Sequence, residues 1–223
     1  MRNKGMCLLS TGFLCWVVGA FGQAQEANTP LKTGDFLPGP FQVLMITGER
    51  AGKFHCPVCE YDLRPAVLVF FPDVDLGPKL IGLLQKLDAL IGKYPAARLT
   101  AGAVFMNDGD YRKLIQQSID SSAKVKDLKL TSAINHKEEQ EAKIKKLARD
   151  ANLKNLTLGL GSHDDVAAYA ADKNKITVLF YLKQRVVSIE SFAKDNLTDQ
   201  EMEKVLKTID ATCMELDQSA RKR

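Results

Sequence analysis

The sequence has no large excess of charge and none of the common motifs for nucleotide binding or acyl transfer. Its formal net charge is only +4 over 223 residues, which is too small to predict binding to nucleic acid or to an anionic membrane surface. It contains no phosphate-binding glycine loop, no serine-nucleophile elbow and no basic stripe interleaved with aromatic residues. We therefore expect no nucleic acid among its partners.

Long uncharged runs are also scarce, and the only one that approaches membrane length lies at the N-terminus. It extends from Met6 to Gly22, after Arg2 and Lys4, and small Ala24 follows. This pattern predicts a cleavable signal peptide over residues 1–24 rather than a retained membrane anchor. Removing two positive charges lowers the formal net charge from +4 to +2. We expect an exported protein, periplasmic or extracellular, whose mature form is not embedded in a membrane.

Cysteine is rare, with five residues in the chain. Cys7 and Cys15 belong to the predicted signal peptide, so Cys56, Cys59 and Cys213 remain after cleavage. In an oxidising compartment the simplest partition joins Cys56 to Cys59 and leaves Cys213 unpaired. Because Cys213 lies among apolar residues of a predicted helix, we expect a small buried hydrophobic residue rather than a resolving thiol.

Cys56 and Cys59 form a CxxC motif directly after His55. Three interpretations stay open. The pair is a redox-active dithiol in which His55 stabilises a thiolate as a nearby cation, a structural disulfide of an exported protein, or part of a metal site. A closed zinc site needs four ligands, and the chain has no second CxxC and no HxxxH. Glu60 stands where haem attachment needs histidine, so no cofactor is expected.

The alternation of apolar runs with helical patterns predicts an α/β domain, a mixed sheet flanked by helices on both faces, over residues 41–216. Residues 25–40 are predicted to be an exposed lead-in. Strands are expected at Phe41–Ile46, Pro65–Phe71, Leu99–Met106, Leu128–Ile134 and Leu156–Leu160, followed by a hairpin of residues 176–182 and 185–189 that turns at Lys183-Gln184. Helices are expected at Pro78–Tyr94, at 108–121, from Asn135, at Asp164–Ala171 and from a capping box at Thr198–Glu201 to about Leu216, before a basic tail at 217–223.

This order of elements resembles the thioredoxin-like superfamily, most nearly its peroxiredoxin and exported thioredoxin-like branch. The segments that carry the resemblance are Gly34-Asp35 followed by Phe41-Gln-Val, the strand PAVLVFF, the strand GAVFMN, the late VAAYA segment and the hairpin ITVLFYLKQRVVSI. The resemblance covers most of residues 34–215. It implies a thioredoxin-like mixed sheet and protein thiols or disulfides as partners.

Two features that the superfamily usually has are missing. Its reactive cysteine follows the central strand, whereas the loop Pro72–Pro78 contains no cysteine, so we do not expect peroxidase activity. Its cis-proline precedes the penultimate strand, where this chain has Ile176 and Thr177. The CxxC pair instead precedes the central strand. It is therefore expected at the opposite end of the sheet, or folded back along the first strand.

From the sequence we hypothesise an exported thioredoxin-like protein that exchanges thiols and disulfides with other proteins. In this hypothesis His55 activates Cys56 as the attacking thiol, and Cys59 is the resolving thiol. The alternative is a non-catalytic thioredoxin-fold module that binds a partner and uses the CxxC pair as a structural disulfide.

Overall fold

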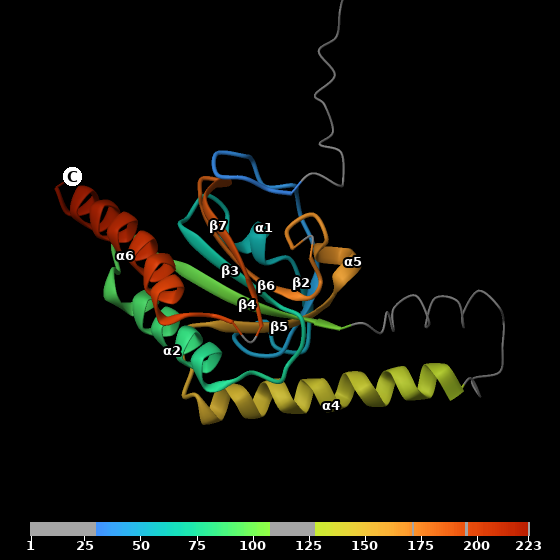
Figure 1. The fold of residues 1–223 in the computed structure, drawn as a ribbon. Helices are drawn as coiled ribbons and strands as arrows, with labels where there is room; N and C mark the ends of the chain where they lie inside the picture. Colours follow the sequence, from blue (N-terminus) through green and yellow to red (C-terminus); the bar gives the residue numbers. More distant parts are fainter. Residues whose placement is uncertain (1–29, 108–127, 171, 195, 223) are drawn as a thin grey trace, which may run out of the picture.

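The computed structural model describes residues 30–107, 128–170, 172–194 and 196–222 (Figure 1). The predicted signal peptide, the predicted helix at 108–121 and Ala171 lie outside the described residues. The strands are β1 (Val43–Met45), β2 (Phe54–His55), β3 (Ala66–Phe71), β4 (Thr100–Asn107), β5 (Thr157–Ser162), β6 (Lys175–Leu182) and β7 (Arg185–Ala193). The helices are α1 (Pro57–Tyr61), α2 (Pro78–Lys93), α4 (Leu128–Asp150), α5 (His163–Val166) and α6 (Asp199–Arg221).

One seven-stranded sheet organises these elements, in the order β2-β1-β5-β4-β3-β6-β7. β3, β4 and β5 run parallel, whereas β6 pairs antiparallel with β3 and β1 pairs antiparallel with β5. Every residue of β3 is buried, because β4 and β6 flank it and helices cover both faces. A continuous apolar run without alternation is typical of such a central strand. The predicted mixed sheet is confirmed.

The sheet separates two hydrophobic clusters, one on each face. Helices α2, α4 and α6 cover the first face, where Phe71 packs with Leu84, Ile144 and Ile209. Helices α1 and α5 contribute to the second cluster, which contains Phe70. Neighbouring residues of a strand point to opposite faces, so Phe70 and Phe71 belong to different clusters. Helices therefore flank both faces of the sheet, as predicted (Figure 1).

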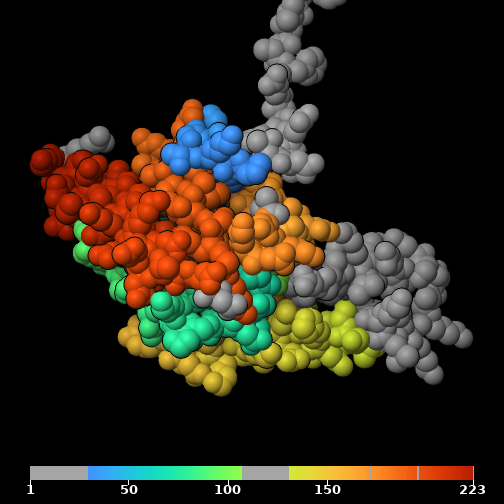
Figure 2. Space-filling model, viewed as in Figure 1, coloured from blue at the N-terminus to red at the C-terminus, as the bar shows by residue number. Residues whose placement is uncertain are grey.

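The closing hairpin turns at Lys183 and Gln184, as predicted, and both residues have positive φ (52° and 60°). Residues 30–40 of the lead-in are described, and Gly34–Leu37 lie against the start of β7, on the surface of the molecule (Figure 2). The Gly34 N–H donates to the Val186 carbonyl (2.8 Å), and the Val186 N–H donates to the Asp35 carbonyl (2.9 Å). The lead-in thus covers part of a sheet edge that would otherwise present unpaired backbone groups.

Helix α4 replaces a predicted strand. The expectation of a strand at Leu128–Ile134, with a new helix from Asn135, is wrong: one helix spans both segments. The buried Ile144 fixes its second half to the sheet, and i,i+4 ion pairs such as Lys143–Glu139 (3.2 Å) support its exposed side. The next predicted helix, Asp164–Ala171, is also shorter, because α5 ends at Val166.

Helix α6 extends to Arg221, beyond the predicted end near Leu216. The reason is Asp217, which is buried and accepts hydrogen bonds from the Ala96 N–H (2.8 Å) and the Arg221 guanidinium (2.7 Å). The first residues of the expected basic tail are therefore part of the packed helix.

The N-terminus of α6 has the predicted capping box. Thr198 Oγ1 accepts a hydrogen bond from the Glu201 N–H (3.2 Å). In return, a Glu201 carboxylate oxygen accepts one from the Thr198 N–H (2.9 Å). We expect Thr198→Ala to lower the free energy of unfolding in urea by about 1 kcal/mol. Thr208→Ala, on the same helix, is the control and should be neutral or slightly stabilising, because alanine is the better helix former. Equal losses in the two variants would contradict this account.

Candidate functional site

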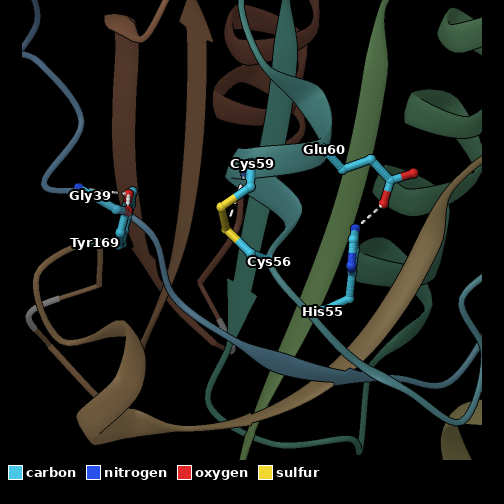
Figure 3. Close-up of a disulfide and its surroundings, with 6 residues drawn as sticks. All are labelled: Gly39, His55, Cys56, Cys59, Glu60 and Tyr169. Carbon is cyan, nitrogen blue, oxygen red and sulfur yellow. Dashed lines mark hydrogen bonds and ion pairs between the residues drawn. A yellow bond between two sulfur atoms is a disulfide. The ribbon is translucent and has the colours of Figure 1, made fainter.

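The CxxC motif opens the short helix α1, directly before the central strand. Cys56 and Cys59 are joined by a disulfide, with their Cα atoms 5.3 Å apart (Figure 3). The preceding strand β2 runs back along β1, with His55 opposite Val43. Of the two positions expected from the sequence, the observed one is that in which the segment folds back along the first strand.

Local sequence accounts for α1. Cys56 is the N-cap residue, and its Sγ accepts a hydrogen bond from the Cys59 N–H (3.1 Å). Pro57 occupies the first helical turn, where its fixed φ suits the helix and no hydrogen-bond donor is lost. Asp62, with φ of +52°, ends the helix. A single turn therefore holds both cysteines close together.

Tyr61 fixes α1 on the sheet. Its side chain is buried, and its hydroxyl forms a hydrogen bond with Thr157 Oγ1 (2.8 Å) at the start of β5. This close approach requires Gly102 on β4, because a Cβ atom there would lie 2.7 Å from the Tyr61 hydroxyl. Burial raises the pKa of Tyr61 to about 12. Sequence reasoning missed Tyr61, and its only signal was its position two residues after Cys59.

The two cysteines differ in accessibility. Cys56 is 9% exposed and belongs to the cluster on the second face of the sheet, whereas Cys59 is exposed on the outer side of α1. The disulfide therefore has one half in the core and one half at the surface. This asymmetry bears directly on the chemistry, because thiol–disulfide exchange requires access to a sulfur atom.

His55 is directed at Glu60 rather than at the disulfide. Its Nε2 lies 2.5 Å from Glu60 Oε2, and Figure 3 shows this pair beside the cystine. The two residues flank the CxxC motif, so their ion pair joins the segment before Cys56 to the residue after Cys59. The sequence predicted His55 as a site residue but missed Glu60, its partner.

The loop Pro72–Pro78, where the superfamily usually has its reactive cysteine, contains an ion pair. Both carboxylate oxygens of Asp73 lie 2.7 Å from Lys194 Nζ. Asp75, the second acid of this loop, lies 3.7 Å from Lys143 Nζ on α4. Thr177, at the position of the usual cis-proline, is buried and hydrogen-bonded to Ser191 (3.1 Å).

Cys213 is a free, fully buried cysteine on the opposite face of the sheet from the disulfide. Burial, reinforced by the nearby Asp210 carboxylate, raises its pKa to about 11. It is a buried apolar residue, as expected, and the sheet separates it from Cys56 and Cys59.

The described part of the chain offers no group of three or more His, Cys, Asp or Glu side chains placed to hold a metal ion. Across the same residues, no helix has both the length and the apolar character needed to cross a membrane.

No protein-family model matches the sequence, and no curated protein does. Solved structures do resemble it. A DsbE-type thiol:disulfide interchange protein of Chlorobium tepidum superposes with a TM-score of 0.53 at 13% sequence identity, over 82% of this chain and 99% of that one. A yeast mitochondrial 1-Cys peroxiredoxin gives a TM-score of 0.53 at 13% identity, over 82% and 77% of the two chains.

A protein of disulfide-isomerase type from Bacteroides thetaiotaomicron also superposes with a TM-score of 0.53, at 13% identity and over 82% of this chain and 91% of that one. At such low identity the likeness concerns the fold alone. Together with the mixed sheet covered by helices on both faces, it establishes that this chain has the thioredoxin-like fold.

Proposed function

We propose that the protein exchanges thiols and disulfides with other proteins through Cys56 and Cys59. The observation that carries this proposal is the exposure of Cys59 in a disulfide whose two cysteines share one helical turn. A disulfide that serves only as a staple does not need an accessible half. An exchange reaction does, because a thiolate has to approach a sulfur atom.

The surroundings of Cys56 support the same chemistry. Exchange releases one cysteine of the pair as a thiolate, and that charge needs hydrogen-bond donors. The Cys59 N–H already points to Cys56 Sγ at 3.1 Å. Because a donor favours the thiolate over the thiol, this arrangement favours opening of the disulfide.

A second function has two observations in its favour. Cys56 packs into the cluster on the second face of the sheet, and the Asp73–Lys194 ion pair stands where related folds usually have their reactive cysteine. A binding module that keeps its CxxC pair as a structural disulfide would also have these features.

The reduction potential of the Cys56–Cys59 pair distinguishes the two functions. For exchange we expect a potential above about −300 mV, together with reduction of insulin when dithiothreitol is supplied. The Cys56→Ser/Cys59→Ser double variant should lose the insulin activity, whereas Cys213→Ala should keep it. A potential below about −300 mV without insulin reduction would assign the disulfide a structural role.

Export is part of the proposed function, because it places the pair in an oxidising compartment. The support is the sequence pattern of residues 1–24. N-terminal sequencing of the protein recovered from outside the cytoplasm should begin at Gln25. Recovery of the uncleaved chain from the cytoplasm would contradict export.

A further inference from the structure

The two sulfur atoms of the disulfide are not equivalent targets. In thiol–disulfide exchange a thiolate attacks one sulfur, and the other leaves as a thiolate. Either cysteine of a CxxC pair is chemically able to take either role. Access and the stabilisation of the leaving thiolate therefore decide the order.

We propose that a partner thiolate attacks Cys59 and that Cys56 is the leaving sulfur. This inference rests on the proposed function and concerns the order of its steps. It reverses the roles that we assigned from the sequence, where Cys56 was the attacking thiol because His55 precedes it. In the structure His55 is paired with Glu60 (2.5 Å), so the basis for that assignment is absent.

Access favours Cys59 as the attacked sulfur. Cys59 is exposed on α1, whereas Cys56 is 9% exposed and lies in a core cluster with Val58 and Tyr61. A partner that approached Cys56 would have to displace α1, and α1 is fixed by the Tyr61–Thr157 hydrogen bond (2.8 Å). Attack at Cys59 leaves this packing intact.

Stabilisation of the leaving thiolate favours Cys56 as the leaving sulfur. Its Sγ accepts the Cys59 N–H (3.1 Å), and its carbonyl accepts the Glu60 N–H (3.1 Å), which holds the residue at the start of the helix. Negative charge that develops on Cys56 Sγ is therefore met by a donor that is already in place.

The steps balance as follows. The partner thiolate forms a bond to Cys59 Sγ, the Cys56–Cys59 bond breaks, and its electron pair stays on Cys56 Sγ. A second partner thiol, once deprotonated, attacks the partner sulfur of the mixed disulfide and releases Cys59 as a thiolate. The partner dithiol is oxidised to a disulfide by two electrons, and the Cys56–Cys59 pair takes up those electrons and the two protons. Reduction of a partner disulfide follows the same steps in reverse, with Cys59 as the attacking thiol.

Single-cysteine variants test the order. In a Cys213→Ala background, Cys56→Ser keeps Cys59, and serine is itself a good N-cap, so α1 should persist. Cys59→Ser keeps Cys56. We expect the Cys56→Ser variant to form a mixed disulfide with oxidised glutathione at least about tenfold faster than the Cys59→Ser variant. Equal rates, or a faster Cys59→Ser variant, would overturn the proposed order.

A second measurement uses the natural sequence and does not depend on the folding of variants. The reduced protein is treated briefly with limiting iodoacetamide and digested with trypsin. Both cysteines lie in the peptide that starts at Phe54, and fragmentation between Pro57 and Val58 assigns the label. We expect alkylation of Cys59 to exceed that of Cys56 by about tenfold. Preferential labelling of Cys56 would contradict the order.

Insulin reduction by the unaltered protein distinguishes a wrong order of attack from a wrong proposed function. If insulin is reduced while Cys56 is the faster thiol, the order is wrong and the proposed function stands. If insulin is not reduced and a glutathione buffer does not open the disulfide, the proposed function fails and this inference fails with it.

Discussion

Replacing Asp88 with alanine is expected to lower the free energy of unfolding by about 3–5 kcal/mol, which is at the high end for a single substitution. Asp88 lies on α2 and is 8% exposed. Its Oδ1 accepts three backbone N–H groups, those of Lys154 (2.9 Å), Asn155 (2.7 Å) and Leu156 (2.7 Å). Alanine would remove the acceptor shared by all three donors. It would also release the chain that leads into β5.

Urea denaturation measures this effect directly, through the midpoint and slope of the unfolding curve. Lys86→Ala on the same helix is a suitable control, because Lys86 is exposed and should change stability by no more than about 0.5 kcal/mol. Asp88→Asn keeps one acceptor oxygen and should fall between the two. A loss below about 1 kcal/mol for Asp88→Ala would show that water or neighbouring groups replace the carboxylate.

At high pH the protein is expected to unfold between about pH 10 and pH 12, through ionisation of buried phenols. Burial raises the pKa of Tyr61 to about 12 and that of Tyr169 to about 12, and it also raises the pKa of Tyr181. The folded chain therefore holds these protons more tightly than the unfolded chain, in which tyrosine titrates near pH 10. The resulting stability is fully present below pH 10 and is lost as the pH rises through 12.

The size of this loss is large compared with the stability of an ordinary domain. The raised pKa values of Tyr61 and Tyr169 each correspond to about 2–3 kcal/mol of stability, and together to about 5 kcal/mol. A typical domain is stable by about 5–15 kcal/mol. Circular dichroism and tyrosine absorbance, recorded together against pH, should therefore change in one cooperative step. Ionisation of all five tyrosines with unchanged circular dichroism would contradict this prediction.

Two phenylalanine variants provide the matched comparison. Tyr61→Phe loses the hydrogen bond to Thr157, which should cost about 1 kcal/mol at neutral pH. The hydroxyl of Tyr181 is buried and has no hydrogen-bond partner among the described residues. Tyr181→Phe should therefore be neutral or stabilising by about 1 kcal/mol, and should raise the pH at which the protein unfolds. Equal destabilisation by the two variants would show that the Tyr181 hydroxyl has a partner, such as a buried water molecule.

Elements whose pattern is strong over their whole length could be predicted from the sequence. The run Pro65–Phe71 has no polar residue and is rich in β-branched and aromatic residues, which favours a strand covered on both faces. The hairpin was evident because two strand-like segments, 176–182 and 185–189, are separated by Lys183 and Gln184 alone. The capping box at Thr198 is a local motif, so its hydrogen bonds form within one turn.

The segment Leu128–Ile134 was mispredicted because its pattern is short and ambiguous. Apolar and polar residues alternate only over Leu128–Thr131, and so short an alternation also fits the start of a helix. What decides between the two is the continuation into α4, whose buried Ile144 lies well beyond that segment. Charged residues around Lys137 then stabilise the helix through i,i+4 pairs.

In the candidate site, the pairing of Cys56 with Cys59 could be predicted from their spacing, but their unequal exposure could not. Tyr61 determines which side of α1 faces the core. Its side chain is held there by the space at Gly102 and by the hydrogen bond to Thr157. These residues are remote in sequence. The partner of His55 was hidden for another reason: adjacency in sequence suggested Cys56, whereas the geometry of the turn brings Glu60 nearer.

The position of Cys213, across the sheet from the CxxC pair, also bears on how the chain acquires its disulfide. Before the sheet forms, Cys56, Cys59 and Cys213 are on a flexible chain, and Cys56 and Cys59 are much closer in sequence to each other than either is to Cys213. A chain that has joined Cys213 to either of them cannot bury Cys213 beside Ile209 in the first-face cluster. In such a chain the wrong disulfide stays accessible to thiols, which can reduce it and let another pair form. The native fold therefore accommodates the Cys56–Cys59 disulfide and excludes a bond from Cys213 to either cysteine.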